Sequence, residues 1–240
     1  MTSTRTDRVT VDDGDFAAHL WMPDAGTGPG LVLLQEIFGV GVFVRGVAEK
    51  LAALGYVVAA PDLFWRFAPN FEATHDEAGL ADAFEKLQQL DVPLAIGDSI
   101  RTLEHVAELD EVQGRPGVIG YCLGGTLAWG VAGQDDPAVC VSYYGSGIPD
   151  MLDLVEKVSC PTLFHFGDID HYLPMEGVAA LIEAISGRAG FTINIEHAGH
   201  AFENFDAPLF YDAAAAEASW AKTVAFLGTH LPTAPAATAP

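Results

Sequence analysis

Short, fully apolar runs alternate along the chain with longer segments whose apolar positions recur at helical spacing. Leu31–Leu34, Tyr56–Ala60 and Pro116–Ile119 are runs of this first kind, which is typical of strands covered on both faces. Val42–Leu54 and Val92–Leu109 have the pattern of helices. Strands that alternate with helices predict an α/β fold with a mostly parallel central sheet and helices on both faces.

The same patterns place the remaining elements. Further strands are predicted at residues 8–12, 16–22, 138–144, 161–166 and 191–195. Further helices are predicted at residues 123–132, 149–158, 175–185 and 211–227, and the acidic segment 71–90 is expected to be partly helical. On the helix at 92–109, Asp98, Arg101 and Glu104 recur at helical spacing and predict a solvated face.

Length and tail composition predict the domain organisation. A chain of 240 residues fits one large α/β domain, which we expect to span residues 1–230. The tail at 231–240 is rich in Pro, Ala and Thr and is expected to be disordered.

Charge and cysteine content restrict the function classes. The formal net charge of −22 excludes nucleic acid as the expected partner, since that partner needs a cationic surface. No apolar run reaches the ~18 residues of a membrane span, and Met1–Arg8 lacks the apolar core of a signal peptide. Three well-spaced cysteines argue against a disulfide framework. Together with the lack of a signal peptide, this leads us to expect a cytoplasmic protein. We expect it to act on a small molecule, as a monomer or a dimer.

One of the cysteines lies in a glycine-rich turn between an expected strand and an expected helix. In Gly120–Gly125 (GYCLGG), glycines stand two positions before and two after Cys122. Strand, sharp turn and helix are the context of the nucleophile elbow, where a Cβ atom at either glycine would collide with a neighbouring strand or helix. The sulfur would lie over a helix N-terminus, which favours a thiolate. The alternative is a buried cysteine in a glycine-rich turn.

Candidate partners for Cys122 follow later strands, in the order nucleophile, acid, histidine that this fold uses. Asp168 and Asp170 follow the strand at 161–166, and His197 and His200 follow the strand at 191–195. Each lies past the carboxyl end of a strand, where open α/β sheets keep their active sites. Asp168 is also a candidate turn former.

Other histidines and one carboxylate have competing interpretations. His165 lies within an apolar strand and is interpreted as a core histidine. Pairing His165 with His171, or His197 with His200, would suggest a metal, but no spacing such as H-E-x-x-H supports it. Glu36 follows four apolar residues at a strand end, so we expect it to face the active-site crevice rather than be an ordinary surface carboxylate. No metal and no cofactor are expected.

Five separated motifs resemble the dienelactone hydrolase family of the α/β-hydrolase fold. They cover nearly the whole chain, in the family's order. The motifs are Gln35–Gly39 (QEIFG), Pro61–Arg66 (PDLFWR), Gly120–Gly125 (GYCLGG), Gly167–Asp170 (GDID) and Ala198–Phe202 (AGHAF).

The resemblance implies hydrolysis of a small lactone or enol ester, as of dienelactone, through a thiol-ester intermediate. By motif position, Cys122 would be the nucleophile, His200 the general base and acid, and Asp170 the carboxylate that orients it. Glu36 would hold and help deprotonate the resting thiol. The backbone N–H groups of Leu123 and Ile37 would form the oxyanion hole.

The resemblance also suggests where a substrate would be bound. Arg66 matches a cation that grips a substrate carboxylate, although it could instead stack on aromatic rings in its loop. The family's second arginine, four residues after the histidine, is here Asn204, which argues against dienelactone itself as the substrate. The predicted substrate-binding residues are Arg66, Trp65, Phe38, Tyr121, Phe202 and Asn204. The alternative functions are a general carboxylesterase or thioesterase acting on uncharged small esters, and a non-catalytic binding protein of the same fold.

Overall fold

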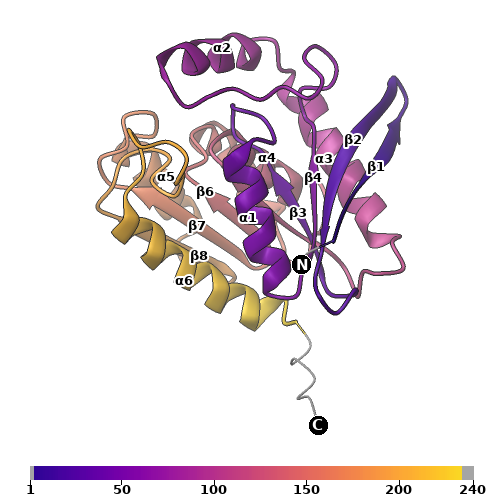
Figure 1. Ribbon diagram of the computed structural model, residues 1–240. Helices are drawn as coiled ribbons and strands as arrows, with labels where there is room; N and C mark the ends of the chain where they lie inside the picture. The colour runs from indigo at the N-terminus through magenta and orange to yellow at the C-terminus, as the bar shows by residue number, and fades with distance from the viewer. Residues whose placement is uncertain (1–2, 234–240) are drawn as a thin grey trace.

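A single sheet of eight strands runs through the protein, whose computed structural model describes residues 3–233 (Figure 1). The strand order is β1-β2-β4-β3-β5-β6-β7-β8. The hairpin β1–β2 and the pair β2–β4 are antiparallel, and the other neighbours are parallel. This confirms the predicted mostly parallel α/β sheet. The strands are β1 (Ser3–Val11), β2 (Gly14–Met22), β3 (Gly30–Leu34), β4 (Val57–Pro61), β5 (Gly117–Tyr121), β6 (Cys140–Tyr143), β7 (Thr162–Gly167) and β8 (Phe191–Glu196).

Helices cover both faces of the sheet and create two apolar cores. In β3, Val32 and Leu34 belong to one core, and Leu31 and Leu33 belong to the other, which explains why the strand is apolar throughout. The first core also contains residues of α3, α4 and α5, and the second contains residues of α1 and α6. The helices are α1 (Val42–Ala53), α2 (Glu77–Leu87), α3 (Val92–Ala107), α4 (Leu123–Ala132), α5 (Met175–Ile185) and α6 (Ala213–His230), with a 3₁₀ helix η1 (Ile148–Glu156).

Two helical predictions differ from the structure. The segment predicted as a helix at 149–158 is the 3₁₀ helix η1, in which Met151 leaves helical geometry at φ −128° and ψ 31° while its carbonyl accepts a bond from the Trp129 indole. The predicted solvated face of α3 is wrong at Asp98, which is only 2% exposed. The loop after β4 packs over Asp98, and the side chains of Trp65 and Arg66 donate to its carboxylate.

The acidic segment at 71–90 contributes α2, which lies above the carboxyl ends of the parallel strands (Figure 1). Asp76 caps this helix, since its carboxylate accepts the backbone N–H of Gly79 at 2.8 Å. The helix is therefore a cap over the end of the sheet where the candidate residues lie.

Near the C-terminus the chain still packs on the domain at Leu231. This side chain is buried, and its carbonyl accepts the Tyr56 hydroxyl at 2.9 Å. The tail predicted at 231–240 falls, from residue 234 onward, outside the described residues. Within residues 3–233, the helices are too short or too polar for any of them to span a bilayer.

Candidate active site

Cys122 lies at the sharp turn between β5 and α4, as predicted for a nucleophile elbow. Its backbone is in an unusual conformation for a residue with a side chain, with φ 55° and ψ −114°. A Cβ on Gly120 would lie 2.0 Å from the carbonyl oxygen of Gly124, and one on Gly124 would lie 2.2 Å from that of Leu34. The two glycines are therefore required for the close contact of β5, α4 and β3.

His200 joins Cys122 to Asp170. His200 Nε2 lies 3.1 Å from Cys122 Sγ, and His200 Nδ1 lies 2.7 Å from Asp170 Oδ2. The other oxygen of Asp170 accepts the backbone N–H groups of Tyr172 and Leu173, at 2.7 and 3.1 Å, which fixes the carboxylate. The three groups follow the ends of β5, β7 and β8, and their arrangement is the one that a nucleophile, a base and its orienting acid require.

The alternative acid and histidine pair with each other instead. His197 Nδ1 lies 3.0 Å from both carboxylate oxygens of Asp168. The His197 side chain is 82% exposed, so this pair lies at the surface and not beside Cys122. His165, as predicted, is a buried core histidine, bonded to Thr223 and Asn194 at 2.9 and 2.8 Å. Burial lowers the pKa of His165 to about 3, so it remains neutral.

The surroundings of His200 favour its charged form. Burial lowers its pKa, but the neighbouring charge of Cys122 and the hydrogen bond that His200 donates to Asp170 outweigh burial and raise it to about 10. The thiol lies at the N-terminus of α4, where free backbone N–H groups favour a negative charge. The site can therefore hold a thiolate beside an imidazolium.

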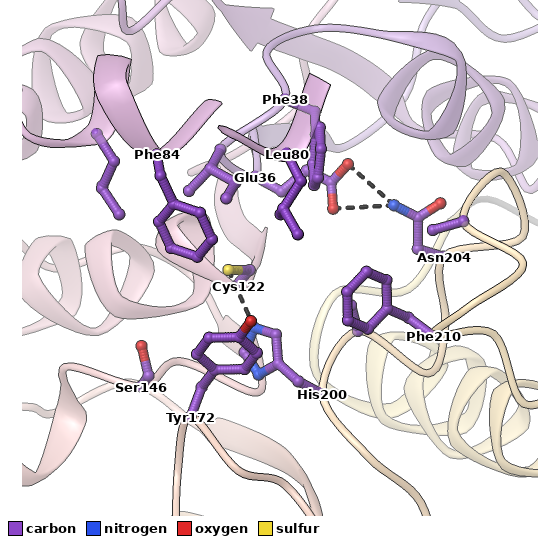
Figure 2. A pocket seen from close by; sticks show the side chains of 14 residues that line it. Glu36, Phe38, Leu80, Phe84, Cys122, Ser146, Tyr172, His200, Asn204 and Phe210 are labelled. Atoms are coloured by element: carbon purple, nitrogen blue, oxygen red, sulfur yellow. Dashed lines mark hydrogen bonds between the residues drawn. The ribbon is translucent and has the colours of Figure 1, made fainter. Parts of the chain in front are cut away.

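A cavity that is open in part to solvent extends from Cys122 and His200 (Figure 2). The cap helix α2 supplies three apolar residues to its wall, and Phe38 and Phe210 supply aromatic ones. Figure 2 shows Leu80 and Phe84 directed toward the space above Cys122. No Lys or Arg is among the described lining residues. These are Glu36, Ile37, Phe38, Leu80, Phe84, Leu87, Cys122, Ser146, Tyr172, His200, Ala201, Asn204, Ala207 and Phe210.

The residues predicted for the oxyanion hole lie at this cavity. Leu123 is the first residue of α4, so its N–H has no partner within the helix. Ile37 lines the cavity from the loop after β3. Their role remains a prediction, which this placement permits.

Glu36 lies in the cavity wall but is held by other groups than the thiol. The side-chain nitrogen of Asn204 donates to both of its carboxylate oxygens at 3.0 Å, and His75 Nε2 lies 3.0 Å from Oε1. Both Glu36 and Asn204 are buried. Asn204 is thus a support for Glu36 at the cavity.

Arg66 and Trp65 do not line the cavity, contrary to the prediction. Arg66 forms ion pairs with Asp13, at 2.7 Å, and with the buried Asp98. Its guanidinium also lies 4.3 Å from the centre of the Trp65 ring, so the stacking alternative describes what is observed. Both residues are occupied by contacts with α3 and with β2 and the turn before it.

Tyr121 and Phe202 were also predicted to bind the substrate, but both are fully buried in the second core. The Tyr121 ring stacks on Tyr143 at 4.5 Å between centroids, and Phe202 packs edge-on against Tyr144 at 5.2 Å. Neither side chain can contact a molecule in the cavity. Tyr144 in turn packs on the His200 ring at 5.1 Å, so this core supports the site from below.

Sequence reasoning missed His75 and the apolar residues of α2. Leu80, Phe84 and Leu87 stand at i, i+4 and i+7, and this spacing is a signal that could have identified an inward-facing stripe. The missed lining residues from other elements are Ser146, Tyr172, Ala201, Ala207 and Phe210. No local pattern marks His75, since both of its partners are distant in the sequence. Among residues 3–233, no group of three His, Cys, Asp or Glu is arranged to hold a metal ion.

Comparison with known proteins identifies relatives over almost the entire chain. The model of the dienelactone hydrolase family matches residues 16–231. A carboxymethylenebutenolidase of Pseudomonas sp. (strain P51) is 34% identical over 85% of this chain and 88% of its own. Carboxymethylenebutenolidase 1 of Cupriavidus pinatubonensis is 32% identical over 95% of this chain and 97% of its own.

Solved structures show the same fold. A dienelactone hydrolase-like promiscuous phosphotriesterase from metagenomic libraries superimposes with a TM-score of 0.80, at 21% identity, over 95% of this chain and 98% of its own.

Proposed function

The chain belongs to the dienelactone hydrolase family and is a carboxylic ester hydrolase of that family's type, and we propose that it cleaves a small lactone or enol ester with Cys122 as the nucleophile. The observation that carries the proposal is the continuous contact from Cys122 through His200 to Asp170, at the base of a largely apolar cavity. A buried cysteine without function would need no such partners.

The chemistry follows from these positions. The Cys122 thiolate attacks the ester carbonyl, and the negative oxygen that forms is stabilised by the N–H groups of Leu123 and Ile37. When the C–O bond breaks, His200 Nε2 donates its proton to the leaving oxygen and a thiol ester remains. Water then attacks the thiol ester, His200 accepts its proton, and the acid is released with Cys122 restored. Asp170 keeps His200 in the required orientation throughout.

The cavity favours an uncharged substrate. The cations expected to bind a carboxylate are missing from its wall: Arg66 is paired elsewhere and Asn204 is neutral. The wall contains a carboxylate, Glu36, and apolar side chains from α2. An anionic group would be desolvated there without a partner, which costs several kcal/mol of binding energy. We therefore propose that the substrate is a neutral lactone or ester. An anionic substrate would be expected if Arg66 lined the cavity.

A panel of matched substrates tests this function. Hydrolysis of neutral lactones and aryl esters should exceed that of their carboxylate-bearing analogues by at least about tenfold in kcat/KM. Stoichiometric labelling of one thiol by iodoacetamide should abolish the activity. A preference for the anionic members would refute the neutral-substrate proposal. Activity that survives labelling of Cys122 would refute the cysteine mechanism. If none of the substrates is hydrolysed, the alternative of a non-catalytic binding protein would be favoured.

A further inference from the structure

A buried histidine just before α2 contacts two carboxylates at once. His75 Nε2 lies 3.0 Å from Glu36 Oε1, and His75 Nδ1 lies 3.0 Å from Asp206 Oδ2. The side chains of His75 and Glu36 are 4% and 3% exposed, whereas that of Asp206 is 39% exposed. The contacts therefore connect the cavity wall to the surface.

Two carboxylates face the ring nitrogens of His75, and a proton on each nitrogen lets the ring donate to both. The backbone N–H of Asp206 donates to Asn204 Oδ1 at 3.0 Å, which directs the amide nitrogen of Asn204 toward Glu36. An ionised carboxylate only accepts hydrogen bonds, and each ring nitrogen of His75 faces one. Asn204 Nδ2 also lies 3.0 Å from His75 Nε2, so a ring without a proton on Nε2 would accept from this amide and lose its bond to Glu36. The imidazolium is the form that donates to both carboxylates.

This contact ties the cap to the rest of the domain. His75 precedes the capping residue Asp76 and so stands at the entrance to α2, whose apolar residues form one wall of the cavity. Its ring also packs on Phe38 at 4.2 Å between centroids. Glu36 belongs to the loop after β3, and Asp206 belongs to the loop between β8 and α6. Three segments far apart in the sequence meet at one side chain.

We propose that protonated His75 is a positioning residue that holds α2 over the cavity, and that loss of its proton releases the helix and weakens substrate binding. Without that proton, His75 loses its hydrogen bond to one carboxylate and the attraction of its positive charge to both. His75 does not touch the reacting atoms. Its kinetic effect rests on the proposed ester hydrolysis, but its hold on α2 does not.

The direction of the pH effect follows from the groups around the ring. Glu36 and Asp206 are the charged groups that face His75, and Arg45 of α1 lies in the field of Asp206. Burial lowers the pKa of His75, but the bond to Glu36 and the charges of Glu36 and Asp206 raise it above its ordinary value of 6.5. The contact should therefore be complete below 6.5 and be lost as pH rises through the higher pKa of His75 in the folded protein.

Kinetics with p-nitrophenyl butyrate, a neutral ester, test the proposal. In the native enzyme, KM should rise by about tenfold overall as pH rises through the pKa of His75, which lies above its ordinary value. His75→Gln should have the high KM at every pH, with kcat within about twofold of native. Asp206→Asn, a milder change at the exposed end, should raise KM in the same direction. His197→Gln is the matched control, because it removes a histidine–aspartate pair at the surface, and it should leave the profile unchanged.

Hydrogen exchange of the amides at 77–87 supplies a readout that does not depend on catalysis. Exchange should be faster in His75→Gln and Asp206→Asn than in the native protein near pH 6, and the native protein should approach the variants at higher pH. Unchanged exchange in both variants would overturn the proposal. So would a lower kcat with unchanged KM, which would place His75 in the chemistry instead. If the native protein hydrolyses no ester, the exchange result still decides whether His75 holds α2 in place.

Discussion

Asn204 Nδ2 donates a hydrogen bond to each carboxylate oxygen of Glu36, at 3.0 Å. Together with His75, these bonds hold the carboxylate in the cavity wall. Cys122 Sγ has a different partner, His200 Nε2, at 3.1 Å. We therefore expect the reactivity of the thiol to depend on His200 and not on Glu36.

Alkylation of Cys122 by iodoacetamide should separate these two roles. Glu36→Gln should change the alkylation rate at neutral pH by no more than about threefold, since the thiol keeps its imidazole partner. His200→Gln should lower the rate by at least about tenfold. Equal losses in the two variants would restore the proton-holding role that the family resemblance suggests for Glu36.

Cys122→Ala should abolish ester hydrolysis and leave the fold intact, because the side chain is the proposed nucleophile. Cys140→Ala is the control: this thiol is fully buried in β6, and burial raises its pKa well above the ordinary value. That variant should keep its kcat. Circular dichroism should first show that both variants are folded, and ester hydrolysis is then measured. Loss of activity in Cys140→Ala alone would contradict the assignment of Cys122 as the nucleophile.

Asp170→Asn should lose far more activity than Asp168→Asn. The amide cannot orient His200 as the carboxylate does, and the corresponding change costs ~10⁴ in rate in a serine triad. Asp168 contacts only the exposed His197 among the candidates, so its replacement should change kcat by less than about threefold. Comparison of kcat at saturating substrate is the measurement, and a larger loss at Asp168 would reverse the assignment.

Hydrolysis should decline at high pH with an apparent pKa near 10. Burial disfavours the His200 imidazolium, but the Cys122 charge and the Asp170 bond raise its pKa to about 10. Since the pKa of His200 is raised in the folded protein, the imidazolium is fully formed below ~6.5 and is lost as pH rises through the folded-state pKa. The leaving group then has no proton donor. A pH–rate profile tests this, and a decline already near 6.5 would show that the pair does not form.

Arg66→Ala should destabilise the fold and leave catalysis unchanged. Among residues 3–233, removing the guanidinium leaves the buried Asp98 with only the Trp65 indole as a side-chain donor, which should cost about 1–3 kcal/mol of unfolding free energy. Arg101→Ala removes an exposed pair with Glu104 on the same helix and should cost less than about 1 kcal/mol. Urea denaturation provides both values. A rise in KM confined to anionic esters in Arg66→Ala would place this residue at the cavity after all.

The position of the elbow and of the triad candidates could be derived from the sequence, because both depend on local pattern. Gly120 and Gly124 are needed wherever a strand turns this sharply into a helix, and they identify Cys122. Asp170 and His200 follow parallel strands, whose carboxyl ends must meet at one edge of the sheet. The choice of Asp170 over Asp168 rested on the family motif and on its position at the strand end, and the structure separates the two by burial and by partner.

Only the tertiary structure decided which side chains of the loops and of the cap reach the cavity. Arg66 and Tyr121 lie in recognisable motifs, yet one turns toward Asp98 and the other into the core. His75 has no motif at all, and its role depends on Glu36 and Asp206, which approach it from distant parts of the chain. Periodicity determines the faces of helices and strands, whereas the direction of a loop side chain is set by partners that only the folded chain brings near.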